Sequence, residues 1–523
     1  WFASTMGRFF DGLAKGYQKS LTAFVRRRWM ALAIMFVALV LIFLLGRAIP
    51  SELAPLEDKS RLSINATAPE GTSFELMDQY ISNIVAYVDT MPERKSIIAL
   101  ASPGWSGARN SGFVQVLLTQ PNERTKSQQQ LANEIQAYLN TQTLARSFVS
   151  QPQTIQAGRG GGGLPVAFVV QAPNFESLKE VVPKFLERAQ DDPRFQVVDV
   201  NLKFNKPELI IEIDRDKARA TGVTVRDIAE ALQLYFSGQR YGFFIYNGKQ
   251  YSVIGQAERH FRNDPSDITG IMVRNDKGNM VELGNLITIT EESTTPQRYR
   301  YNRYVSATFR ASTVPGVTLG QGIEAMREIS REVLDDRFTT TLTGISQQFE
   351  ESSGSMYFAF IFALILVYLV LAAQFESYRD PLIIMFTVPL ALAGALITLY
   401  LLGHTMNIFS QIGIIVLVGI VTKNGILIVE FANQKKIKGM EKAPAVIEAA
   451  GQRLRPILMT SLSTIFGAIP IALAIGTSST SRIPMGVTII GGLLFALGLT
   501  LYIVPAMYSY ISKKTANIIS DEE

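Results

Sequence analysis

Gln411-Ile-Gly-Ile-Ile-Val-Leu-Val-Gly-Ile-Val-Thr-Lys423-Asn-Gly-Ile-Leu-Ile-Val-Glu430 is an apolar stretch with one lysine well inside it. At about 1.5 Å per residue, a helix of this length spans a hydrocarbon core about 30 Å thick. A charged side chain near the centre of a bilayer costs on the order of 3 kcal/mol and usually marks an ion or substrate path. Snorkelling to the headgroups is the alternative, but the run ends near Asn433, about 15 Å further along the helix. We therefore predict a transmembrane helix in which Lys423 has a function.

Five other stretches also have the length and apolar composition of transmembrane helices, and none of the six predicted spans, of which the one with Lys423 ends at Val429, contains Asp or Glu. Basic residues gather in alternate connections, whereas the two short hairpins on the other side carry only His404 and Arg482. Because Lys and Arg are enriched in cytoplasmic loops, this distribution predicts both chain ends in the cytoplasm and the large soluble segment outside. The predicted spans are Met30–Ile49, Met356–Phe375, Pro381–Leu402, Ile408–Val429, Pro456–Ile475 and Ile483–Tyr508.

The segment from residue 51 to 355 is polar, and in it alternating strands recur with amphipathic helices. Four β-α-β units at this spacing predict two α+β sandwiches of the split β-α-β kind. Between the last two units lies an insert with hairpin turn signals at Asn247-Gly248 and Asp276-Lys277-Gly278. The predicted fold is therefore a six-helix membrane bundle with a large α+β loop. Its parts are 1–29 (amphipathic segment), 30–49 (span), 50–155 (first subdomain), 156–237 and 301–354 (second subdomain), 238–300 (β-rich insert), 355–511 (five spans) and 512–523 (tail).

The composition excludes several classes of function. The 523 residues include no Cys and two His far apart in sequence, so we expect no thiolate or histidine metal site. The net charge of +5 sits in short loops, which argues for membrane topology rather than nucleic-acid binding. Gly158–Gly163 matches G-x-G-x-x-G, but Leu164-Pro165 and a strand follow it instead of a helix. We therefore predict no nucleotide site and no cofactor.

Lys423 needs a counter-charge that the six spans do not contain. Glu376, Asp380 and Glu430 lie at span ends, so we expect the partner from another polypeptide segment or another copy. A lysine that faces buried carboxylates forms a proton relay, because protonation of the acid releases the lysine. The chain begins at Trp1 without an initiator Met or a signal-peptide pattern, so we expect a piece of a longer polypeptide or a chain whose start is missing.

Arg453 and Thr460 are candidates for the same polar seam. They are seven residues apart, so they lie on one face of the helix that follows the Lys423 helix. Each also has an ordinary interpretation. Arginines collect at cytoplasmic span ends, and a threonine hydroxyl can bond to a carbonyl of its own helix.

Several motifs together resemble one family of transporters. Gly419-Ile-Val-Thr-Lys423-Asn-Gly-Ile-Leu-Ile-Val-Glu-Phe-Ala432 closely resembles a signature of resistance-nodulation-division (RND) multidrug efflux permeases. Arg453-Leu-Arg-Pro-Ile-Leu-Met-Thr460-Ser is similar to the next motif of that family, and Pro50–Asp58 and Pro315-Gly also resemble its signatures. The resemblance covers essentially the whole chain, and it is closer to the hydrophobe/amphiphile branch than to the heavy-metal branch.

The resemblance implies that this chain is the C-terminal half of such a permease. The soluble segment would then hold two periplasmic porter subdomains and, inserted in the second, part of the docking funnel. The family works as a trimer in the Gram-negative inner membrane, joined to a periplasmic adaptor and an outer-membrane channel. Proton influx drives the export of varied amphiphilic compounds. Lys423, Arg453 and Thr460 match relay positions, whereas the relay aspartates belong to the N-terminal half and are expected from that partner.

The resemblance also implies a substrate site. Ser102–Gly112 matches the glycine-hinged switch loop, with Trp105 at a position that is usually aromatic, and Gly158–Gly163 matches the entrance loop between the porter subdomains. Ile98, Pro103 and Gln115 fall where multidrug pumps often carry phenylalanine, which predicts an altered substrate preference. The predicted substrate-contacting residues are Trp105, Ile98, Pro103, Phe113, Gln115 and Arg159. The predicted flexible glycines are Gly104, Gly107, Gly160 and Gly163.

Two other functions remain open. One is a protein-export or lipid-handling component of the same superfamily, whose members lack the complete pair of porter modules with the docking insert. The other is a membrane-anchored scaffold without transport, whose activity would survive replacement of Lys423 by alanine.

Overall fold

The computed structural model describes residues 2–103, 110–155, 164–204, 206–295, 297–474 and 480–512. The chain forms two compact units. The first comprises Trp1–Ala68, Ser73–Asn201 and Tyr299–Glu523, and the second comprises Pro69–Thr72 and Leu202–Arg298. The second unit therefore includes more of the chain than the predicted insert, because it begins at Leu202 rather than at residue 238.

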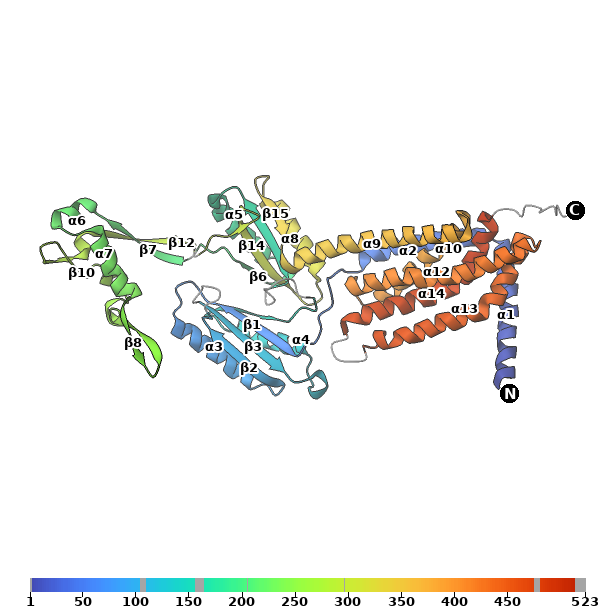
Figure 1. Cartoon of the computed structure of the whole chain (residues 1–523), viewed down its shortest axis with the longest axis horizontal. Helices are drawn as coiled ribbons and strands as arrows, with labels where there is room; N and C mark the ends of the chain where they lie inside the picture. The colour runs from blue at the N-terminus through green and yellow to red at the C-terminus, as the bar shows by residue number, and fades with distance from the viewer. Residues whose placement is uncertain are drawn as a thin grey trace. The chain divides into compact units, whose positions relative to one another are not determined.

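Among the described residues, six helical segments are long and apolar enough to cross a membrane, which confirms the six predicted apolar helices (Figure 1). Three of them extend well beyond the predicted spans: one begins at Gly344 rather than Met356, one begins at Lys442 rather than Pro456, and one continues to Ile437 rather than ending at Val429. The six segments are α2 (Trp29–Ala48), α9 (Gly344–Phe375), α10 with α11 (Arg379–Met385 and Thr387–Leu401), α12 (Ile408–Ile437), α13 (Lys442–Ala472), and η6 with α14 (Thr480–Arg482 and Ile483–Ile511).

Helix α14 is the centre of the bundle and packs against α11, α12 and α13. Small residues allow the close approach, since a Cβ added at Gly394 of α11 would lie 2.2 Å from the Cβ of Phe495. A Cβ at Gly491 would lie 2.0 Å from the Thr398 hydroxyl oxygen. By contrast, α2 and α9 bury only 17% and 6% of their apolar windows, so most of their surface is left for lipid or a partner.

The first α+β subdomain is a four-stranded antiparallel sheet in the order β2-β3-β1-β4. Helices α3 (Phe74–Asp89) and α4 (Gln128–Asn140) cover one face, where alternate strand residues such as Ile64, Val114 and Val116 are fully buried. The other face carries polar and large apolar side chains. The strands are β1 (Arg61–Thr67), β2 (Arg94–Ala101), β3 (Ser111–Leu118) and β4 (Arg146–Ser150).

The second α+β subdomain is an antiparallel sheet in the order β13-β14-β5-β15, with β6 also paired to β14. Helices α5 (Phe175–Gln190) and α8 (Leu319–Val333) pack on it, and Phe168, Phe185 and Phe309 meet in its core. The chain enters the second unit after β6 and returns at β13. The strands are β5 (Val166–Ala172), β6 (Phe195–Val200), β13 (Arg300–Tyr301), β14 (Tyr304–Thr313) and β15 (Thr339–Leu342).

The described residues of the second unit form three two-stranded sheets, two short α-helices and several single helical turns. Both predicted hairpins form. Asn247-Gly248 joins β8 to β9 with positive φ at both residues, and Gly278, also with positive φ, lies in the turn that connects β10 to β11. Helices α6 and α7 were not predicted from the sequence. The elements are β7 (Lys206–Ile213), α6 (Arg215–Thr221), α7 (Val225–Leu232), β8 (Gln239–Tyr246), β9 (Lys249–Gly255), β10 (Met272–Arg274), β11 (Met280–Glu282) and β12 (Ile287–Thr294).

A polar contact ties the end of α2 to the connection between α11 and α12. The backbone N–H of Glu52 donates to the Met406 carbonyl (3.0 Å), and the Thr405 hydroxyl donates to the Glu52 carboxylate. Burial raises the pKa of Glu52 above its ordinary value, and the Thr405 hydrogen bond only partly offsets this effect.

Replacing Glu52 with glutamine should therefore raise the melting temperature at pH 7 and leave it unchanged at pH 4. The folded-state pKa exceeds the unfolded value of about 4.3, so the wild-type carboxyl favours folding at low pH and this contribution is lost as pH rises. Glutamine keeps an acceptor for Thr405 without the charge. Melting curves between pH 4 and 8 test this, with Glu187→Gln on the exposed surface of α5 as control. A variant that melts below wild type at pH 7 would contradict the expectation.

Candidate functional site

The face of α12 that carries Lys423 is not covered by the described part of this chain. Ile412, Val416, Gly419, Lys423 and Glu430 are all exposed, and their spacing of three, four or seven residues places them on one side of the helix. No described carboxylate pairs with Lys423. The lysine thus stands in the middle of an open apolar stripe, available to a neighbour outside this chain.

The opposite side of α12 is fixed to α13 by a buried polar contact. The Asn424 amide, 3% exposed, donates to the Ser461 hydroxyl oxygen over 3.1 Å. Because Asn424 follows Lys423 directly, burying one of them turns the other outward by about 100°. Sequence reasoning did not single out Asn424, although an amide beside a lysine in an apolar helix was a visible signal.

The Asn424–Ser461 hydrogen bond should contribute about 1 kcal/mol to bundle stability, as interhelical hydrogen bonds in membranes do. A double-mutant cycle with Asn424→Ala and Ser461→Ala, read by thermal unfolding in detergent, measures the coupling. Ser463→Ala, an exposed serine on the same helix, serves as control. Strictly additive losses from the two single variants would show that the pair does not hold α12 and α13 together.

Arg453 lies on the same α12–α13 seam. Its guanidinium carbon is 4.3 Å from the ring centroid of Phe431 on α12, a cation–π distance. Its Nε atom is buried and has no hydrogen-bond partner among the described residues. A donor held in this way is available to an acceptor that another segment brings.

Thr460 makes a local contact. Its hydroxyl donates to the Ile457 carbonyl over 3.3 Å, which is the ordinary interpretation considered from the sequence. The Asn424–Ser461 and Phe431–Arg453 contacts run in opposite sequence directions, so α12 and α13 are antiparallel and Lys423 and Thr460 lie at a similar level. Within the described chain, no contact joins Lys423 to Arg453 or to Thr460.

Three predicted substrate residues share the open face of the first sheet. Ile98 pairs with Gln115 across β2 and β3, and Phe113 pairs with Leu100. Ile98 is 58% exposed, because α3 and α4 cover only the other face. Pro103 follows β2 and is half-buried. The remaining predicted residues lie outside the described part of the chain: Trp105, Arg159, Gly104, Gly107, Gly160 and Gly163.

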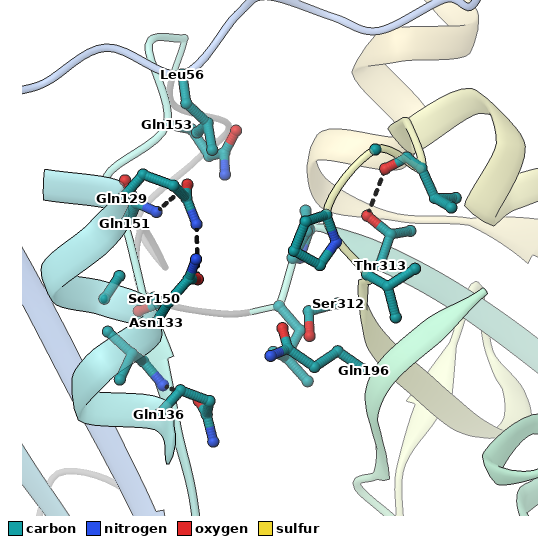
Figure 2. A pocket seen from close by; sticks show the side chains of 18 residues that line it. Leu56, Gln129, Asn133, Gln136, Ser150, Gln151, Gln153, Gln196, Ser312 and Thr313 are labelled. Carbon is teal, nitrogen blue, oxygen red and sulfur yellow. Dashed lines mark hydrogen bonds between the residues drawn. The ribbon is translucent and has the colours of Figure 1, made fainter. Parts of the chain in front are cut away.

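A cavity of about 420 Å³ lies between the two α+β subdomains, within the size range of small-molecule sites (Figure 2). Figure 2 shows amide side chains of α4 on one side and Gln196 and Ser312 on the other. The side-chain amide of Gln151 donates to the side-chain oxygen Oε1 of Gln129 over 2.6 Å. No described charged side chain lines the cavity. Its polar lining residues are Gln129, Asn133, Gln136, Ser150, Gln151, Gln153, Gln196, Ser312 and Thr313.

Sequence reasoning missed this cavity, although part of its signal is local. Gln129, Asn133 and Gln136 recur at helical spacing on one face of α4. The opposite wall comes from β6 and β14, and only the fold brings these strands to α4. Gln153 and Leu164 both line the cavity and flank the Gly158–Gly163 segment in sequence.

The comparisons with known proteins each match nearly the whole chain and identify one family. The model of the AcrB/AcrD/AcrF family matches residues 1–512. An uncharacterized transporter of Haemophilus influenzae is 30% identical over 505 residues, which cover 95% of this chain and 48% of that protein. Multidrug resistance protein MdtC of Proteus mirabilis is 30% identical over 508 residues, which cover 96% of this chain and 49% of that protein. The chain thus spans about half the length of the curated relatives that it matches.

Proposed function

Because this chain belongs to the AcrB/AcrD/AcrF family of RND permeases, we propose that it is the C-terminal half of a proton-driven pump that exports amphiphilic molecules. The family consists of transporters, and the six apolar helices make the chain a multi-pass membrane protein. The observation that carries the proposal is the exposed Lys423 in the middle of α12, with no described counter-charge.

In this proposal the N-terminal half covers the open face of α12 and supplies carboxylates opposite Lys423. While the acids are ionised, they pair with the lysine across a low-dielectric interface. Protonation removes that attraction and raises the cost of leaving the lysine buried, so the two halves shift. Arg453 supports this role, because its unpaired buried Nε can hydrogen-bond an acceptor that arrives with the shift. Thr460 would contribute its hydroxyl after breaking its local bond to Ile457.

The substrate path in the proposal follows the open face of the first sheet and the amide-lined cavity. Ile98, Phe113 and Gln115 offer a surface that mixes apolar and amide groups, which suits amphiphiles. The cavity adds neutral hydrogen-bonding groups, so it favours polar uncharged head portions over strongly charged ones. Pro103, Trp105 and Arg159 are assigned to this path on the family resemblance alone, as are the flexible glycines.

The partners in the proposal are two further copies, a periplasmic adaptor and an outer-membrane channel, all in the Gram-negative inner-membrane setting of the family. The β8–β9 hairpin of the second unit supports an assembly role. Phe243 and Ile245 on one side and Phe244 and Tyr246 on the other are all exposed, at 52–72%. A two-stranded hairpin cannot bury both of its faces alone, so a partner surface is needed.

Transport in proteoliposomes tests the proposed function. The chain is reconstituted with an N-terminal half, a pH gradient is imposed, and the movement of an amphiphilic dye and of protons is recorded. The expected result is dye transport that requires both halves and collapses with a protonophore. Transport driven equally well without a gradient, or by the chain alone, would overturn the proposal. Movement of labelled phospholipid but not of dye would favour the lipid-handling alternative.

Replacing Ile98 with phenylalanine should increase the preference for planar aromatic dyes. The side chain is exposed on the open sheet face, so the larger ring fits without repacking. The phenylalanine ring then forms an aromatic pair with the ring of the dye. The half-saturating dye concentration should fall about two- to tenfold. Ile437→Phe, at an exposed position near the end of α12, is the control and should leave the value unchanged. An equal effect of the two substitutions would argue against a dye site on this face.

A further inference from the structure

A second cavity, of about 490 Å³, lies where the end of α1 meets the beginning of α13. The amphipathic helix α1 (Phe2–Arg26) packs across the end of the bundle, with Leu21 and Val25 buried against it. The Gln18 side chain fills the space beside Gly451, so α1 is seated directly on α13. The cavity is lined by Gln18, Thr22, Val25, Arg26, Arg28, Ala443, Pro444, Ile447 and Glu448.

The cavity has an excess of positive charge. Arg26 and Arg28 both line it, and neither has a carboxylate partner among the described residues. The Arg28 guanidinium lies 5.4 Å from the centroid of the Tyr510 ring, which holds it in place. The lining carboxylate of Glu448 is already engaged, because Lys435 Nζ lies 2.6 Å from it and Gln452 donates to it over 3.0 Å.

The first turn of α13 also borders the cavity. Ala443 and Pro444 line it, and the N-cap residue Glu441 makes no side-chain capping hydrogen bond. Val25, Pro444 and Ile447 form an apolar wall next to the two arginines. The site therefore offers two guanidinium groups and a helix N-terminus beside an apolar surface.

The cavity is also placed at the boundary of the apolar bundle. Helix α2 begins at Trp29, directly after Arg28, and Trp29 is 66% exposed, as is typical of a residue at the headgroup level. An occupant would thus reach the guanidinium groups from the bilayer surface. Basic pockets between helices at such a boundary suit anionic headgroups.

We propose that this cavity binds a phosphate-bearing anion, with Arg26 and Arg28 as its charged ligands and the headgroup of an anionic phospholipid as the source that the apolar wall favours. If Arg26, Arg27 and Arg28 served only to set the orientation of the following helix in the membrane, no cavity beside them would be needed. Arg27 separates the two interpretations, since it belongs to the same triplet but does not line the cavity. A bound lipid would clamp α1 to α13, the helix that carries Arg453 and Thr460.

Native mass spectrometry of the full chain in a neutral detergent tests the site. The probes are phosphatidylglycerol, phosphatidylcholine and inorganic phosphate, and the variants are Arg26→Gln and Arg28→Gln, singly and together. We expect one tightly held phosphatidylglycerol per chain. Each substitution should weaken it about fivefold and the pair about 30-fold, whereas the matched control Arg27→Gln should change it by less than about twofold.

The outcomes separate the possibilities. Equal retention of phosphatidylcholine, or equal weakening by Arg27→Gln and Arg26→Gln, would overturn the proposal. Displacement of the lipid by millimolar inorganic phosphate would support the phosphate site and assign it to a soluble anion, and failure to displace it would assign it to the lipid.

A second variant covers the case in which the arginine variants do not fold. Ala443→Glu places a negative charge in the first turn of α13, where it stabilises the helix but repels a phosphate. We expect an unchanged or raised melting temperature together with at least tenfold weaker phosphatidylglycerol binding. Full retention of the lipid by this variant would contradict the site.

Discussion

Replacing Lys423 with alanine is expected to lower proton-driven transport at least about 100-fold while leaving the amount of folded protein in the membrane unchanged. The side chain is exposed in this chain, so its removal leaves no cavity in the bundle formed by the described residues. What disappears is the charge that would pair with carboxylates of the N-terminal half. Without this charge, protonation of those acids changes no interaction with α12. The proton gradient is then no longer coupled to the conformational change.

The measurement is dye efflux in proteoliposomes under a pH gradient, with the quantity of reconstituted protein and its melting temperature recorded alongside. Lys438→Ala is the matched control, because it removes a lysine from the end of the same helix, beyond the predicted span. It should keep transport within about twofold. Normal transport by the Lys423→Ala variant would show that Lys423 is not needed for proton coupling and would favour a different coupling site.

Gly394→Val is expected to destabilise the helical bundle by about 3 kcal/mol, the upper part of the usual range for overpacking. The new Cβ would lie 2.2 Å from the Cβ of Phe495 and 2.9 Å from the Gly491 carbonyl oxygen. Neither atom is the free end of a flexible side chain, so α11 and α14 must move apart. This is the most extensive helix contact in the bundle, and the displacement should spread to the packing of α12.

Thermal unfolding in detergent and the yield of folded protein measure this effect. Gly498→Val is the control on α14, because a Cβ there meets no atom within 4 Å. Both substitutions place a β-branched residue in a helix, so the propensity change is the same and the difference isolates the interhelical contact. Equal melting temperatures for the two variants would show that α11 and α14 can separate at little cost.

Apolar length and charge asymmetry are local properties, and for that reason the sequence alone determined much of this protein. A run of about 20 apolar residues has the length and composition of a transmembrane helix whatever its neighbours do, so the six apolar helices could be predicted without knowing their contacts. The two hairpin turns were equally local, since Asn247-Gly248 adopts positive φ at both positions. The Lys423 motif together with the Arg453–Ser461, Pro50–Asp58 and Pro315-Gly motifs carried the family prediction, which the match over residues 1–512 bears out.

Only the tertiary structure decided which side of each helix is buried. Gly394 and Gly419 look alike in sequence, yet a Cβ added at the first would clash with α14, whereas a Cβ added at the second would meet no atom within 4 Å. Lys423 points outward because the opposite side of α12, which includes Asn424, is buried against other helices, and the amide-lined cavity forms because the fold brings α4 to β14. Helix rotation and the walls of cavities are set by contacts between residues far apart in the chain, and local composition and spacing do not specify which residues meet.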